Sequence, residues 1–144
     1  MIVIADTSAL LAAFDADQPD HDRARAVLDA EAMVISPLVL TELDHLVTAR
    51  LNFETALAVQ DALLSRMDVG QYRLASLGVD EVVRAQEVRR QYRSLQLDLA
   101  DGVGVVLADV HRTNHIFTSD QRDFRAVTPL TPGFDAFRLL PADL

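Results

Sequence analysis

The sequence predicts an α/β fold in which a largely parallel sheet carries helices on both faces. Three observations lead to this prediction. Short apolar segments of strand length alternate with longer segments whose apolar residues recur every three or four positions. Polar or proline-containing turns separate these segments. The alternation is typical of βαβ units, in which each helix returns the chain to the same edge of the sheet, so that the strands run parallel.

The first half of the chain contains two predicted strands and four predicted helices. An apolar run from residue 2 ends at Asp6, which predicts a buried strand followed directly by a helix. Ser36 and Pro37 are typical of a helix N-cap and first helical position, and Asn52 of a second cap. The predicted ranges are strands at 2–5 and 33–36, and helices at 7–15, 20–31, 37–50 and 53–66.

The second half continues the alternation with less regularity. A helix is predicted over 79–94, with an exposed face that carries Arg84, Arg89, Arg90 and Arg93. These arginines indicate either a phosphate-contacting surface or an ordinary solvated helix face. The other predicted ranges are strands at 71–75 and 115–119, a helix at 99–111, and weaker strand candidates within 124–140, where two prolines and a glycine interrupt the pattern.

Length and composition indicate one domain over residues 1–144, because half of the 144 residues are hydrophobic and can form one core. No apolar stretch is long enough to span a membrane, and the acid at residue 6 argues against a signal peptide. The chain has no cysteine, so we expect a cytoplasmic protein in which any metal is held by oxygen or imidazole.

The net charge of −9 argues against broad electrostatic binding to nucleic acid. Two features weaken that objection. All 13 basic residues are arginine, whose guanidinium group suits bidentate contact with phosphate. Several acids could also be neutralised by a metal ion. The charge therefore leaves nucleic acid open as a substrate and favours a basic binding partner.

Four acids occupy informative positions. Asp6 and Asp120 each follow a predicted strand, and the carboxyl ends of strands are where open α/β sheets bind ligands. Glu42 and Asp101 each interrupt an apolar helical segment, where an unpaired carboxylate is costly. A divalent cation would remove that cost, since Mg²⁺ prefers oxygen ligands. The four acids thus predict a metal site.

Each acid also has a structural alternative. Asp6 could cap the helix that follows it, and Glu42 could be an ordinary surface residue. Asp98 and Asp101 are spaced as the N-cap and third residue of a helix, and capping is the better explanation for Asp98. Asp120 could belong to a simple turn. The combination favours a site, because four separate coincidences would otherwise be needed.

Four motifs in order resemble the acidic motifs of PIN domains, and more narrowly those of VapC-type toxins. They are Ile4-Ala-Asp6-Thr-Ser-Ala-Leu10, Ser36-Pro-Leu-Val-Leu-Thr-Glu42-Leu, Leu99-Ala-Asp101-Gly and Phe117-Thr-Ser-Asp120-Gln-Arg-Asp123-Phe. The resemblance covers essentially the whole chain. It implies a three-layer α/β/α fold around a largely parallel sheet.

The resemblance also implies a Mg²⁺- or Mn²⁺-dependent endoribonuclease. Asp6 and Asp101 match the principal metal-binding acids, and Glu42 and Asp120 complete the catalytic set directly or through water. Accessory roles are implied for Asp123 and Asp98. Hydroxyl groups near the cluster, which would hydrogen-bond the carboxylates, are those of Thr7, Ser8 and Thr118.

The resemblance further implies a VapB-like antitoxin, an RNA substrate and a homodimer. Rival enzymes fit less well: a haloacid-dehalogenase-type phosphatase would need a second acid at position 8, and a receiver domain would need a lysine, which the chain lacks. A PIN-like RNA-binding or assembly module without catalytic activity remains the main alternative.

Overall fold

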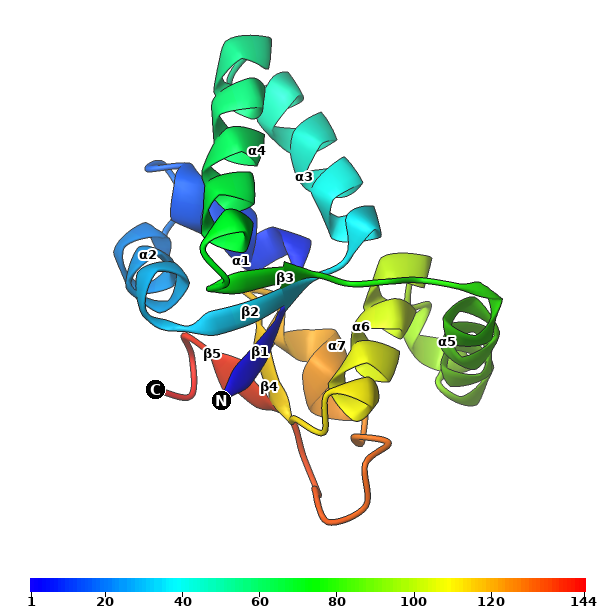
Figure 1. Ribbon diagram of the computed structural model, residues 1–144. Helices are drawn as coiled ribbons and strands as arrows, with labels where there is room; N and C mark the ends of the chain where they lie inside the picture. Colours follow the sequence, from blue (N-terminus) through cyan, green and yellow to red (C-terminus); the bar gives the residue numbers. More distant parts are fainter.

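The computed structural model describes all residues, 1–144, and is organised by one five-stranded sheet (Figure 1). All four strand pairings are parallel, and the strand order is β3-β2-β1-β4-β5. The strands are β1 (Ile2–Ala5), β2 (Ala32–Ile35), β3 (Tyr72–Leu74), β4 (His115–Phe117) and β5 (Arg138–Leu140). The predicted parallel sheet is therefore present.

Seven α-helices connect the strands. They are α1 (Thr7–Phe14), α2 (His21–Ala30), α3 (Pro37–Arg50), α4 (Phe53–Asp68), α5 (Val79–Gln91), α6 (Leu99–Val110) and α7 (Gln121–Ala126), with a short 3₁₀ turn, η1 (Arg93–Leu95), after α5. Two predicted caps are present: Ser36 accepts the amide N–H of Leu38, and Asn52 accepts that of Thr55. None of the helices is long and apolar enough to cross a membrane.

The sheet separates two hydrophobic cores, because successive residues of a strand point to opposite faces. In β1, Val3 belongs to the core with helices α1–α4, and Ile4 belongs to the core with α5–α7. Phe117 and Ile116 of β4 divide in the same way. Figure 1 shows the resulting arrangement, with the α3–α4 pair on one side of the sheet and α6–α7 on the other. The fold is therefore the expected three-layer α/β/α architecture.

The region after β4 differs from the prediction. Residues 121–126 form helix α7, where we predicted no helix, and of the weak strand candidates within 124–140 only the last forms β5. The helix has only six residues, of which Phe124 alone is buried. Its ring packs edge to face on Phe137. One buried apolar residue gives no helical periodicity in the sequence, so the conformation of this segment depends on a contact with a residue distant in sequence.

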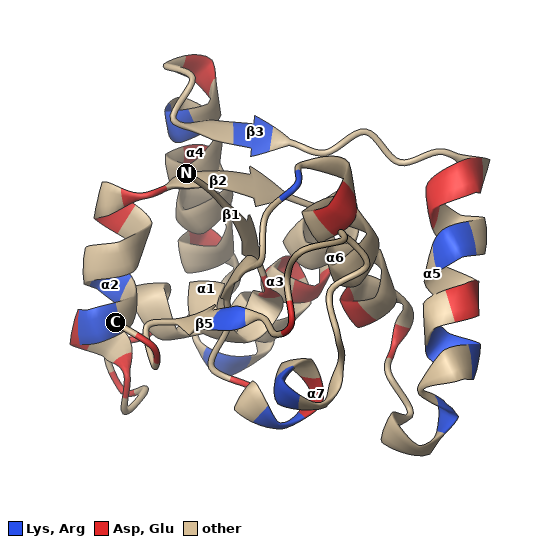
Figure 2. Ribbon diagram, turned by 90° about the horizontal axis from the view of Figure 1, so that it is seen from below, with Lys and Arg blue, Asp and Glu red and all other residues tan.

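The arginine-rich face predicted on α5 is divided between structural and free side chains. Figure 2 shows basic and acidic segments alternating along this helix at the edge of the molecule. Arg84 pairs with Asp109 on α6, and Arg89 donates to the main-chain oxygen of Leu97. Two of the four arginines thus attach α5 to the rest of the fold. Arg90 and Arg93 are exposed.

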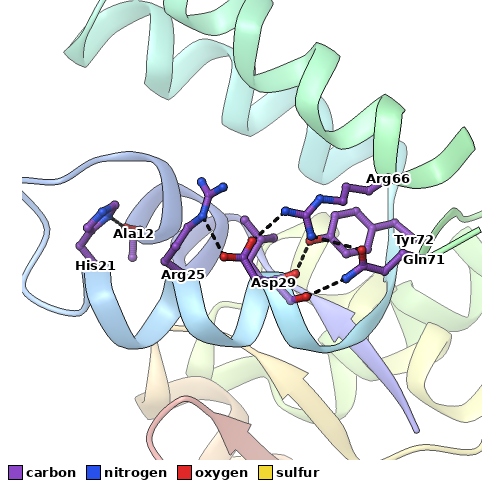
Figure 3. A network of polar contacts seen from close by, with 8 residues as sticks. Ala12, His21, Arg25, Asp29, Arg66, Gln71 and Tyr72 are labelled. Carbon is purple, nitrogen blue, oxygen red and sulfur yellow. Dashed lines mark hydrogen bonds and ion pairs between the residues drawn. The ribbon is translucent and has the colours of Figure 1, made fainter. Parts of the chain in front are cut away.

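A polar network joins α2, α4 and β3 at the amino ends of the strands (Figure 3). Arg66 donates to the carboxylate of Asp29 and to the side-chain oxygen of Gln71. Gln71 donates in turn to the main-chain oxygen of Asp29, and the Tyr72 hydroxyl donates to that of Leu28. The network fixes the helix–strand connections at the end of the sheet opposite the carboxyl ends.

Candidate active site

A cleft of about 360 Å³ lies at the carboxyl ends of the strands, where the sequence predicts a site. Its walls come from the residue after β1, from α1 and the α1–α2 connection, from α3, from the start of α6 and from the segment after β4, which parallel strand order brings together. The lining residues are Asp6, Thr7, Ser8, Leu11, Gln18, Glu42, Leu46, Arg50, Asp98, Asp101, Ser119 and Asp120. All four predicted metal-site acids therefore line one cleft.

Asp6 stands at the end of β1 and is held by two hydroxyl groups. Its Oδ2 accepts hydrogen bonds from Ser8 Oγ and Thr118 Oγ1, each at 2.8 Å. Ser8 Oγ in turn accepts the amide N–H of Ser119 at 3.0 Å. The carboxylate makes no helix-capping hydrogen bond from its side chain, so the capping alternative does not describe Asp6. These bonds fix its orientation toward the cleft.

Glu42 enters the cleft from the second turn of α3. Its Oε1 accepts a hydrogen bond from Thr7 Oγ1 at 3.4 Å, a long contact across two helices. All three hydroxyl side chains singled out in the sequence, Thr7, Ser8 and Thr118, therefore contact carboxylates of the cleft.

Asp98 and Asp101 approach the cleft from the start of α6. Asp98 is the N-cap residue of that helix, and its Oδ1 accepts the amide N–H of Asp101 at 2.8 Å. The capping role expected for Asp98 is thus present, although its carboxylate also lines the cleft. Asp101 itself has no side-chain partner that would offset its charge.

Asp120 and Asp123 belong to the segment after β4. Asp120 lines the cleft as the residue before α7, where it makes no side-chain cap. Asp123, in the first turn of α7, lies outside the lining and is 3.9 Å from the exposed guanidinium of Arg122. Its charge still raises the pKa of Asp101, so it contributes to the electrostatics of the cleft.

Withdrawal from water and mutual repulsion raise the pKa values of three of these acids. Desolvation is the largest cause for Asp6, partly offset by its hydrogen bonds to Thr118 and Ser8. Desolvation also raises the pKa of Glu42, with repulsion from Asp98 and Asp6. The pKa of Asp101 rises to about 8 through desolvation and repulsion from neighbouring acids. The protein thus concentrates negative charge that it does not itself neutralise.

These residues suit a hard divalent cation. The donors are oxygen atoms, and a cation would offset the repulsion that raises the three pKa values. No three acidic or histidine side chains are close enough to enclose an ion directly. Mg²⁺ needs only one or two direct carboxylates, since it retains several waters. The arrangement fits such an ion with a partly hydrated shell.

The sequence did not predict several of the residues that line the cleft. Gln18 comes from the α1–α2 connection, where its side chain donates to the carboxylate of Asp15 at 3.2 Å, and no sequence signal marks it. Arg50 and Leu46 carry a recognisable signal. They follow Glu42 at intervals of four residues along α3, which places all three on one face of the helix.

Comparison with known proteins identifies the family of this chain. The family model described as "PIN domain" matches residues 3–128. Ribonuclease VapC26 of Mycobacterium tuberculosis is 40% identical over 141 residues, which cover 96% of this chain and 100% of that protein.

Solved structures of low sequence identity share the fold. M. tuberculosis VapC20, described as a sarcin-ricin loop cleaving toxin, has a TM-score of 0.72 and 18% identity over 84% of this chain and 91% of its own. Rickettsia felis VapBC2, bound to a DNA fragment from its promoter, has a TM-score of 0.66 and 15% identity over 96% of this chain and 98% of its own. A Klebsiella pneumoniae toxin–antitoxin complex has a TM-score of 0.59 and 20% identity over 90% of this chain and 98% of its own.

The family match covers most of the chain, and the three-layer fold agrees with it. The chain belongs to the PIN domain family, and within it to the VapC group.

Proposed function

We propose that this protein is a metal-dependent endoribonuclease that acts as the toxin of a VapBC-type pair. The observation that carries the proposal is the convergence of Asp6, Glu42, Asp101 and Asp120 in one cleft. Support for RNA as substrate comes from the 40% identity to a protein named ribonuclease VapC26. The reaction is hydrolysis: water oxygen joins phosphorus while the bond from phosphorus to the leaving oxygen breaks.

Asp6 and Asp101 are the proposed principal ligands of Mg²⁺ or Mn²⁺, with Glu42 and Asp120 acting directly or through water. When bound, the cation supplies charge neutralisation at the phosphate and a lowered pKa for water, so that a nucleophile forms at neutral pH. Ser8 and Thr118 hold the Asp6 carboxylate in one orientation. Such hydrogen bonds to a ligand keep it positioned and set its basicity.

The acidic cleft also supports the proposed antitoxin. The chain has a net charge of −9, and five carboxylates line the cleft. A basic segment of a VapB-like partner would complement this potential. Two of the similar structures carry the names of toxin–antitoxin assemblies. We further propose a homodimer, which light scattering on the purified protein would test.

The nuclease activity is tested by incubating purified protein with RNA in Mg²⁺ or Mn²⁺, and in EDTA. We expect cleavage with either metal, no cleavage in EDTA, and loss of cleavage in Asp101→Asn. Asp61→Asn is the matched control, because Asp61 is an exposed acid of α4 outside the cleft. Failure of the wild-type protein to cleave RNA would favour the inactive RNA-binding or assembly module.

The toxin role has a separate test in growing bacteria. Expression should arrest growth, Asp6→Ala should relieve the arrest, and co-expression of a basic antitoxin should do the same. Equal growth arrest by the wild-type and Asp6→Ala proteins would contradict a catalytic toxin.

A further inference from the structure

One basic side chain lines the cleft together with the acids. Arg50 is the only basic side chain among the residues that line it, where five carboxylates are also present. Arg50 is nevertheless exposed, and it forms no ion pair with any of those acids. An arginine that lines an acidic cleft and pairs with none of its carboxylates keeps its five N–H donors available for a ligand.

The position of Arg50 separates it from the proposed metal ligands. It lies eight residues after Glu42 on the same face of α3, which corresponds to about 12 Å along the helix axis. The two side chains therefore serve different parts of a bound molecule. Leu46 lies between them and also lines the cleft.

We propose that Arg50 binds a phosphate that flanks the scissile phosphate of the RNA strand, and so holds the strand across the acids. This inference rests on the proposed ribonuclease function. The planar guanidinium group matches two phosphate oxygens at once and stays charged at all relevant pH values. The acids repel a polyanion, so a cation at one end of the cleft supplies the attraction that they lack.

A purely structural role makes a different prediction. Arg50 is in the last turn of α3, where a cation is favourable next to the negative end of the helix dipole. In that case Arg50 would affect the stability of α3 but not RNA binding. Kinetics and salt dependence separate the two roles.

The test compares wild type, Arg50→Gln, Arg50→Lys and Arg73→Gln in cleavage of an end-labelled RNA pool of randomised sequence in Mn²⁺. Arg73 is the matched control, because it is an exposed arginine of β3 without an ion pair and lies near His111, away from the cleft. Arg50→Gln should raise KM about tenfold and change kcat little, since a contact to a remote phosphate contributes mainly to ground-state binding. Arg50→Lys should recover part of the loss.

Salt dependence supplies the second readout. Loss of one phosphate contact to single-stranded RNA should reduce the slope of log(kcat/KM) against log[salt] by about 0.7 in Arg50→Gln and leave it unchanged in Arg73→Gln. If Arg50→Gln matches wild type in KM and slope while the wild type cleaves RNA, the inference about Arg50 is wrong and the nuclease function stands. If the wild type cleaves no RNA, the proposed function itself fails.

Discussion

Replacing Thr118 by valine removes the hydroxyl group that donates to Asp6 and that also accepts the amide N–H of Asp120 at 3.0 Å. Thr118 is 1% exposed, and its Oγ1 lies 2.8 Å from Oδ2 of Asp6, so solvent cannot replace the lost hydroxyl. Valine keeps the shape of the side chain and removes the donor. A hydrogen bond to a charged group contributes about 1.5–3 kcal/mol, so Thr118→Val should lower the free energy of unfolding by that amount.

The same substitution should weaken metal binding. Of the two hydroxyl donors to Asp6 only that of Ser8 remains, so the carboxylate is less firmly oriented. Loss of such a supporting hydrogen bond typically lowers metal affinity by about 10–100-fold. Urea unfolding in EDTA measures the stability, and titration calorimetry with Mn²⁺ measures the affinity.

Thr113→Val is the matched control. Thr113 is also buried, but its Oγ1 donates at 2.7 Å to the main-chain oxygen of Ile2, at the far end of the sheet. The Thr113→Val protein should lose about 1 kcal/mol of stability and keep its affinity for Mn²⁺. The reasoning is refuted if Thr118→Val binds Mn²⁺ as wild type does, or if both variants lose affinity equally.

Three further predictions follow from the titratable and polar groups. In EDTA, the melting temperature of the wild type should fall between about pH 7 and about pH 9. Asp101 (pKa about 8) holds its proton in the folded state, whereas the unfolded chain has already lost it, and this stabilisation disappears as the pH rises through 8. Asp101→Asn should give a flatter profile, and equal slopes in the two proteins would count against a raised pKa for Asp101. Asp98→Ala should lose about 1 kcal/mol of stability in urea unfolding because it lacks the helix cap, whereas Asp98→Asn should keep the cap and the stability. Unequal RNA cleavage by Asp98→Asn and wild type would assign the charge of Asp98 a role beyond capping. Tyr72→Phe should lose about 1 kcal/mol through the bond to Leu28 and leave cleavage unchanged, and reduced cleavage would show that this network reaches the cleft.

Local patterns in the sequence determined most of the elements of this fold. Apolar runs and helical periods predicted the strand at 2–5 and the helix at 37–50 with the observed bounds, and the strand at 115–119 with two residues too many at its carboxyl end. They succeeded because each of these elements is specified by its own residues, through burial of one face and through caps such as Ser36. The strands that precede Asp6 and Asp120 also predicted the edge at which these acids lie.

The tertiary structure alone decided which of these features meet. Strand order set β1 between β2 and β4, and this order brings Glu42, Asp101 and Asp120 to one cleft across long intervals of sequence. It also placed Arg50 in the lining of the cleft without an ion-pair partner, and formed α7 around Phe124 where no local period is present. The physical reason is the same in each case: periodicity reports which face of an element is buried, while the identity of its neighbours depends on the packing of the whole chain.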